Sequence, residues 1–513
     1  ASEEGFYLTD TDTIRFCTAP ATGSSCFIIQ CGSAVSIPTP GDGTVTAAKI
    51  ASGAVTTAKI ADANVTAAKI ASGVQLVTID GQGNTVAGTN AGASFSGTDA
   101  NGNTLVGRNS GNLISTGDDN TSIGYYSLDV TTTGSRNIAV GKGSLGSNTT
   151  ASDNTAVGTD AMISNTTGNS NVAVGTYALD ANTTANANTA VGAASLGANT
   201  TGAENTALGS VALQKNTTGA NNTAVGRQCL QENTTAGSNT GVGYQALQYN
   251  TTGDNLVAVG DRALTGNTTG ASNTGIGIQA GSNTTTGSAN TSVGMQALLF
   301  NTTGGNNTAL GKDALRANTT ASNNVAIGYD SLTANTTGTD NVAVGRAALE
   351  SNTTADNNTA VGQNALASNT TGAANTAVGD EALDGNTTAS YNTAVGSSAI
   401  GDNSTGESLT AVGYLALKSN TTANNNTAVG KSALQENTTG TQNIAVGSEA
   451  LDANTTGNYN VAIGFGALTD NQTGIRNTAV GDNALADVNT NDNTAIGYLS
   501  ARNTTGADNT AVG

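Results

Sequence analysis

One pattern of apolar and polar positions repeats along most of the chain. From Gly107 to Gly481 a glycine recurs every 17 residues without a slip, and the last two intervals, to Gly497 and Gly513, shorten to 16. The generic unit is NTAVGxxALxxNTTGxx, in which a short apolar segment precedes the repeat glycine and an Ala-Leu pair follows it. Helical repeats need two helices and thirty or more residues per unit. The period therefore predicts an all-β protein in which each unit is one coil of a parallel β-solenoid.

Each fixed position of the unit has an expected structural role. We predict that the segment ending in Thr-Ala-Val is a short strand, and that its valines stack from coil to coil on one face. The glycine after this strand and the glycine after Asn-Thr-Thr are expected to turn the corners, because glycine enters positive φ freely. The two fixed asparagines tolerate the left-handed conformation and can hydrogen-bond to their copies one coil away. The valines assigned to packing are Val157, Val174 and Val191.

The leucine of the Ala-Leu pair is the second apolar site of each unit. Two sizeable apolar side chains per coil make a thin core, because burial contributes only about 25 cal/mol per Å². If the leucine column points outward against the same column of neighbouring chains, oligomerisation supplies the missing burial. We therefore predict that the stable unit is a homo-oligomer. The leucines assigned to this interface or core packing are Leu179, Leu196, Leu213, Leu230 and Leu247.

Residues 1–106 differ from the regular repeats at 107–513. Residues 1–43 hold all three prolines and three cysteines, and we expect a small β domain there, with strands at 11–16 and 27–30 and a disulfide for stability. Three cysteines cannot all pair within one chain, so the odd one is either free or bridges to a neighbouring subunit. The candidate disulfide residues are Cys17, Cys26 and Cys31.

Two further segments connect this domain to the regular repeats. Residues 44–73 contain three ten-residue units with the pattern VTAAKIA, for which we expect extended or mixed structure, because a ten-residue step gives no constant helical face. Lys49, Lys59 and Lys69 recur at this step, either as a positive collar or, as we favour, on a solvated face. Residues 74–106 carry degenerate copies of the longer unit.

Composition and charge exclude the commonest catalytic and nucleic-acid-binding designs. The chain has no His, so it lacks Ser-His and Cys-His pairs and imidazole metal ligands. Its net charge of −19 opposes binding to nucleic acid or to an anionic membrane surface. No apolar run approaches the ~20 residues that span a bilayer. We expect no enzyme, no cofactor, no metal and no membrane insertion, and we favour a small buried role for Cys229, which replaces an alanine of the unit, over a crosslinking one.

The repeated Asn-Thr-Thr admits three interpretations. It is an Asn-x-Ser/Thr acceptor for glycans, a structural Asn/Thr ladder at a corner, or, if its threonines stack about 4.8 Å apart on a flat face, an ice-binding hydroxyl lattice. We favour the structural ladder. The glycan candidates are Asn148, Asn165, Asn182, Asn199, Asn216 and Asn233.

Tyrosines that directly follow the repeat glycine could contact carbohydrate or a host receptor. Because they are scattered among the coils, we interpret most of them as surface variation. They are Tyr125, Tyr244, Tyr329, Tyr414 and Tyr498.

The core NTAVGxxAL resembles the head repeat of YadA-type trimeric autotransporter adhesins. The fuller NTAVGxxALxxNTTG is similar to repeats of phage tail fibres and bacterial surface fibres, and the VTAAKIA units are similar to tail-fibre shaft segments. The resemblance covers residues 107–513. It implies parallel, left-handed β-rolls packed as a homotrimeric rod, whose function lies in reach, attachment and mechanical stability.

We therefore expect an extracellular structural fibre of about 24 coils, on the order of 115 Å long. The chain begins at Ala1 and not at Met, which favours a mature secreted product. Head-to-tail polymerisation is a further expectation, in which the N-terminal domain covers the open last coil of the next subunit. The expected partners are other copies and a cell-surface or host carbohydrate or protein. The alternatives are a receptor-binding viral tail fibre or adhesin, and an ice-binding solenoid.

Overall fold

The computed structural model describes residues 6–8, 14–16, 22, 77–96 and 99–513. The chain divides into two units, Ala1–Val74 and Gln75–Gly513, which we describe separately. In the first unit β1 (Phe6–Leu8) pairs antiparallel with β2 (Ile14–Phe16), which occupies the last three residues of the strand expected at 11–16. The strand expected at 27–30, the ten-residue units at 44–73 and the three N-terminal cysteines lie outside the described residues.

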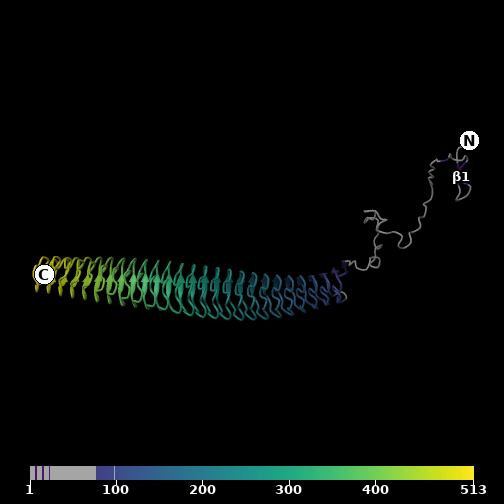
Figure 1. Ribbon diagram of the computed structural model, residues 1–513, viewed down its shortest axis with the longest axis horizontal. Helices are drawn as coiled ribbons and strands as arrows, with labels where there is room; N and C mark the ends of the chain where they lie inside the picture. The colour runs from purple at the N-terminus through teal and green to yellow at the C-terminus, as the bar shows by residue number, and fades with distance from the viewer. Residues whose placement is uncertain (1–5, 9–13, 17–21, 23–76, 97–98) are drawn as a thin grey trace. The chain divides into compact units, whose positions relative to one another are not determined.

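The second unit is a parallel β-solenoid with one three-residue strand in each coil (Figure 1). It begins with β3 (Thr78–Ile79), which runs antiparallel to β4 (Thr85–Ala87). No helix occurs among the described residues. The coil strands that follow are β5 (Thr104–Val106), β6 (Thr121–Ile123), β7 (Ile138–Val140), β8 (Thr155–Val157), β9 (Val172–Val174), β10 (Thr189–Val191), β11 (Thr206–Leu208), β12 (Thr223–Val225), β13 (Thr240–Val242), β14 (Val257–Val259), β15 (Thr274–Ile276), β16 (Thr291–Val293), β17 (Thr308–Leu310), β18 (Val325–Ile327), β19 (Val342–Val344), β20 (Thr359–Val361), β21 (Thr376–Val378), β22 (Thr393–Val395), β23 (Thr410–Val412), β24 (Thr427–Val429), β25 (Ile444–Val446), β26 (Val461–Ile463), β27 (Thr478–Val480), β28 (Thr494–Ile496) and β29 (Thr510–Val512).

The register of the sheet follows the sequence repeat. From β4 to β29 each strand pairs in parallel with the next one, and equivalent positions face each other. Ala190, for example, pairs with Ala173 and with Ala207. The prediction of a parallel β-solenoid with a strand at Thr-Ala-Val is confirmed.

Alanine and leucine side chains fill the interior of each coil. In the coil that follows β11, Ala207 of the strand and the pair Ala212 and Leu213 are completely buried. Consecutive residues of an extended chain point to opposite faces. Leu213 instead has a left-handed backbone with φ 51°, and both members of the pair face inward.

The leucines do not point outward against neighbouring chains, because a single chain already buries them. Of the two roles assigned to them, interface or core packing, the structure supports core packing. None of the five has exposed surface: Leu179, Leu196, Leu213, Leu230 and Leu247.

The valines stack as predicted, but on the outer face of the sheet. The middle residue of each strand faces the interior, so the first and third residues face outward. Val174 pairs in register with Val157 and Val191, and its side chain is 37% exposed. In one chain these valines do not belong to the core.

The corners follow the predictions only in part. The glycine that ends each coil strand has φ between 128° and 149°, as expected. The glycine after Asn-Thr-Thr does not have a positive φ, and alanine takes its place at Ala185 and Ala236. The leucine and the residues at two variable positions, such as Val211 and Asn221, adopt the left-handed conformation instead. The two fixed asparagines of the described coils do not adopt it.

Cys229 is buried inside its coil, as expected, and strand β13 compensates for its size. This strand has Gly241 where most strands have alanine, and a Cβ added there would lie 2.5 Å from the sulfur of Cys229. A larger residue on one side of the interior is thus matched by a smaller one on the other.

The variant Gly241→Ala is expected to destabilise its coil by roughly 1–3 kcal/mol through overpacking. The double variant Cys229→Ala/Gly241→Ala restores the common alanine pair and should recover most of that loss. Native-state hydrogen exchange of peptides covering residues 226–246 measures the local effect, and peptides from coils near residue 400 serve as the internal control. Equal destabilisation of the single and double variants would contradict the compensation.

Candidate functional surfaces of the solenoid

Two buried ladders of asparagine side chains connect the coils. An asparagine precedes most strands, and Leu256 and Leu409 replace it before β14 and β23. In the ladder that these asparagines form, Nδ2 of Asn205 donates to Oδ1 of Asn188 at 3.2 Å and to the carbonyl of Gly219 at 2.9 Å. In the Asn-Thr-Thr corner, Nδ2 of Asn216 donates to Oδ1 of Asn199 and to the same carbonyl, both at 2.9 Å. All four asparagines are completely buried. The predicted ladders are confirmed.

This geometry argues against glycans at the corner. All six glycan candidates are completely buried, and in Asn199 the atom that would carry the sugar, Nδ2, donates to Asn182 and to Gly202 inside the solenoid. The threonines are also partly used for structure. The hydroxyl of Thr200 donates to the carbonyl of Thr217 at 3.0 Å, and only the second threonine of each motif is exposed. This corner therefore presents one exposed column of threonines and not a lattice of two threonine columns.

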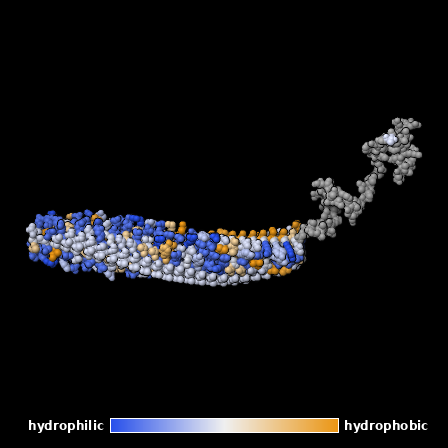
Figure 2. Space-filling view, in the orientation of Figure 1, coloured by the Kyte–Doolittle hydropathy of each residue, from blue (hydrophilic) through white to orange (hydrophobic). Residues whose placement is uncertain are grey.

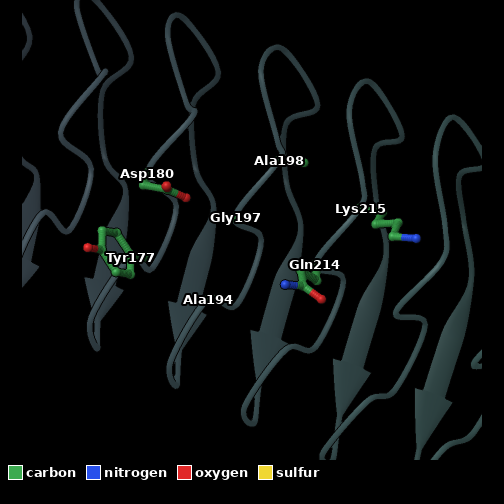
Figure 3. A pocket seen from close by; sticks show the side chains of 7 residues that line it. All are labelled: Tyr177, Asp180, Ala194, Gly197, Ala198, Gln214 and Lys215. Atoms are coloured by element: carbon green, nitrogen blue, oxygen red, sulfur yellow. The ribbon is translucent and has the colours of Figure 1, made fainter.

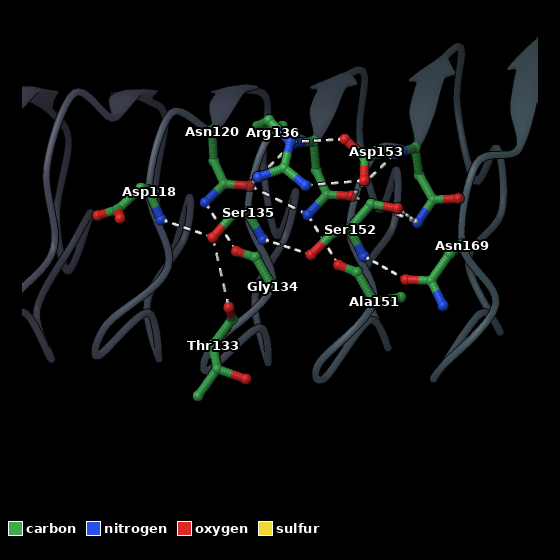
Figure 4. A network of polar contacts seen from close by, with 12 residues as sticks. Asp118, Asn120, Thr133, Gly134, Ser135, Arg136, Ala151, Ser152, Asp153 and Asn169 are labelled. Atoms are coloured by element: carbon green, nitrogen blue, oxygen red, sulfur yellow. Dashed lines mark hydrogen bonds and ion pairs between the residues drawn. The ribbon is translucent and has the colours of Figure 1, made fainter.

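A third ladder of hydrogen bonds lies on the surface of the solenoid (Figure 4). It is formed at a variable position, two residues before the asparagine that precedes the strand. The N–H of Ser135 donates to Oγ of Ser152 at 3.0 Å, and the N–H of Ser152 donates to Oδ1 of Asn169 at 2.8 Å. Beside it, the guanidinium of Arg136 forms two hydrogen bonds with the carboxylate of Asp153, at 2.7 and 2.9 Å. Exposed pairs of this kind contribute little to stability, because solvent screens them, so we interpret them as surface stabilisation.

A shallow depression of about 440 Å³ spans three successive coils (Figure 3). It forms because the middle coil presents only small residues at its outward positions, between larger side chains on both sides. The signal of this depression in the sequence is a coil with three small residues at variable positions. The sequence analysis did not identify it. The lining residues are Tyr177, Asp180, Ala194, Gly197, Ala198, Gln214 and Lys215.

Two charged groups line this depression. Burial raises the pKa of Asp180, and the nearby Asp160 acts in the same direction. Lys215 forms an ion pair with Glu232 at 2.6 Å. A carboxylate, an amide and an aromatic ring could hold a small polar ligand, but the lining residues do not form a nucleophile and base pair.

The described part of the chain holds no group of three or more His, Cys, Asp or Glu residues that could bind a metal ion. None of its described segments is a helix long and apolar enough to cross a membrane. Burial raises the pKa of Cys229 to about 12, so the thiol stays protonated near neutral pH and is a poor nucleophile.

The fold thus defines the chain as a β-solenoid repeat protein of 17-residue coils. No protein-family model matches it, and no curated protein matches its sequence. The functional argument therefore depends on the surfaces of the solenoid.

Glycosylation of the folded protein is expected to avoid the buried asparagines. In protein secreted from a glycosylating host, peptides containing Asn182, Asn199 and Asn216 should be unmodified, because a glycan on Nδ2 would displace the ladder. Asn283 heads another Asn-Thr-Thr motif but is exposed, so it is the internal positive control. Peptide mass spectrometry measures occupancy, and equal occupancy at Asn199 and Asn283 would contradict the ladder.

The variant Asp180→Asn is expected to be more stable than the native protein at pH 7 but not at pH 3. Burial raises the pKa of Asp180, so its stability contribution is complete below the unfolded pKa and is lost as pH rises through the folded pKa. Asp153→Asn should show the opposite sign, because the hydrogen bond from Arg136 lowers the pKa of Asp153. Urea midpoints at both pH values measure these effects, and a gain for Asp180→Asn that is equal at pH 3 would disprove the assignment.

Proposed function

We propose that the protein is an extracellular structural fibre whose shaft is a homotrimer of parallel, left-handed β-solenoids. The observation that carries this proposal is an unbroken stack of in-register coils with an apolar outer face along its whole length. The extracellular location, the handedness and the number three come from the resemblance to adhesin and tail-fibre repeats.

Continuous hydrogen bonding between coils supports a mechanical role. The N–H of Gly209 donates to Val191 of the coil before it at 2.8 Å, and the N–H of Leu213 donates to Cys229 of the coil after it at 3.0 Å. The asparagine ladders add side-chain bonds at the same interface. Bending or stretching the solenoid must break several of these bonds at once, which gives a stiff rod.

The outer face of the sheet supports self-association. The third residue of most coil strands is apolar and about 36–47% exposed. Figure 2 shows a row of apolar side chains along one edge of the solenoid in the part nearer its N-terminal end. Contiguous exposed apolar surface of this extent marks an interaction site. Six members of this outer apolar column are Val174, Leu208, Val242, Val259, Ile276 and Leu310.

A second copy of the chain is the occupant that fits this column best. The column repeats at the coil spacing of about 4.8 Å over the whole sheet. Only a partner with the same spacing over the same length covers every position in register, and another copy has both. The head-to-tail joint through residues 1–43 remains a prediction.

The trimer can be tested by introducing charge into the outer apolar column. Sedimentation equilibrium of the full chain should give three times the monomer mass of 50.1 kDa. A fourfold lysine variant should shift the protein to monomers, because each buried ammonium costs several kcal/mol. The substitutions are Val225→Lys, Val242→Lys, Val259→Lys and Ile276→Lys.

The matched control adds the same four charges to exposed threonines at the opposite corner, and it should remain trimeric. These substitutions are Thr218→Lys, Thr235→Lys, Thr252→Lys and Thr269→Lys. A monomeric native protein, or equal dissociation of both variants, would overturn the proposed assembly.

A further inference from the structure

Positive charge is scarce on the solenoid, and the cations without a carboxylate partner lie in coils next to three exposed tyrosines. Thirteen of the 17 Lys and Arg residues belong to residues 99–513. Eight of them form ion pairs. Within the described coils the other five have no ion pair, and each lies in the coil directly before or after Tyr125, Tyr244 or Tyr329. They are Arg108, Lys142, Arg227, Arg262 and Arg346.

Three of these five cations lie over tyrosine rings. Tyr244 lies between Arg227 and Arg262, and both guanidinium carbons are 5.9 Å from the ring centroid. Arg108 lies 5.7 Å from the ring centroid of Tyr125. Cations over a ring face at this distance are attracted by the ring quadrupole. The third site repeats the arrangement, with a lysine over Tyr329 at 4.8 Å.

The three tyrosines directly follow the repeat glycine, so they lie in one column at the corner after the strand. We call this column, with its flanking cations, the tyrosine column. Tyr125 and Tyr244 are seven coils apart, and Tyr244 and Tyr329 are five coils apart. At about 4.8 Å per coil these separations are roughly 35 and 25 Å. The tyrosines are 38–47% exposed, so both ring and cation are open to a ligand.

The acidic groups near the tyrosine column are few. Lys312, which stacks on Tyr329, is already paired with Asp313 at 2.6 Å, and Asp261 is exposed next to Arg262. Nε of Arg262 donates to Oε1 of Gln245 at 3.2 Å. Because a guanidinium carries several N–H donors in its plane, the arginines at Tyr125 and Tyr244 keep further donors for a ligand beside an aromatic face.

We propose that the tyrosine column binds an anionic polysaccharide, a sugar chain that carries carboxylate or sulfate groups. The exposed ring packs against the C–H face of a pyranose, and the flanking cations donate to its anionic groups. Sites spaced along one line favour a polymer that engages more than one of them, because linked contacts raise the overall affinity.

Nucleic acid fits this surface less well. Binding it requires many neutralised phosphates, whereas the tyrosine column has a few cations separated by tens of ångströms. The net charge of −19 also repels a dense polyanion. Acidic groups on other faces are screened beyond a Debye length of about 8 Å at physiological ionic strength. A sparsely charged sugar chain in direct contact with the cations is therefore the better match.

The proposal can be tested by titrating the full chain with defined hexasaccharides. Calorimetry should detect binding of hexagalacturonate, a carboxylate source, or of a chondroitin sulfate hexasaccharide, a sulfate source, and the affinity should fall with salt. Maltohexaose, which is neutral, should bind at least about tenfold more weakly. The variant Arg227→Gln/Arg262→Gln and the variant Tyr244→Ala should each weaken binding by about threefold to tenfold, because other sites remain.

The matched control is Arg136→Gln/Arg476→Gln, which removes the same charge from two arginines paired with Asp153 and Asp492. It should change the affinity less than twofold. Absence of binding to either charged hexasaccharide, equal binding of maltohexaose or of a twelve-residue oligothymidylate, or an equal loss in the control would overturn the proposal. So would a change of oligomeric state in Arg227→Gln/Arg262→Gln, because the column would then belong to a subunit interface. The proposal does not depend on the trimer.

Discussion

Buried asparagine side chains hydrogen-bond from coil to coil along the solenoid, and these ladders hold neighbouring coils in register. Asn205 and Asn216 are completely buried, and each donates to the carbonyl of Gly219 and to an equivalent asparagine one coil away. A buried amide without a partner costs about 1–3 kcal/mol. Where the last two intervals shorten to 16 residues, the strands stay in register and the ladder before the strand continues through Asn477, Asn493 and Asn509. The corner ladder does not continue there, because Val488 stands in place of its asparagine. The regular 17-residue spacing is therefore what keeps both ladders in register.

The same requirement limits what the interior can hold. Because the ladders fix the path of the backbone, the interior has room for the strand alanine and an Ala-Leu pair. A larger side chain is accommodated where the residue that faces it across the interior is smaller. Cys229 and Gly241 show this exchange. The larger apolar residues of the strand, such as Leu208, then face outward. The apolar surface for a partner, which we expected at the leucine column, therefore lies at the third residue of the strands.

The sequence predicts those features that depend only on one coil stacking on an identical neighbouring coil. The strand, the glycine that ends it and the asparagine ladders follow from spacing and residue type alone. The direction of the leucines does not, because it depends on a left-handed backbone at Leu213 and its equivalents, a conformation that bulky residues rarely adopt. The depression beside Asp180 also escaped prediction, because it depends on variable positions of three coils together.

We place ligand binding at those variable positions, because the fixed positions are either buried or belong to the outer apolar column. The fixed asparagines and leucines are buried, and the first threonine of the corner donates within the solenoid. Within residues 99–513, ion pairs such as that of Arg136 with Asp153 account for most of the positive charge. A guanidinium beside Tyr244 that lacks a carboxylate adds little stability, about 0.5–1 kcal/mol at an exposed site. In a chain of net charge −19, an unpaired cation next to an exposed ring is better explained by a ligand than by folding.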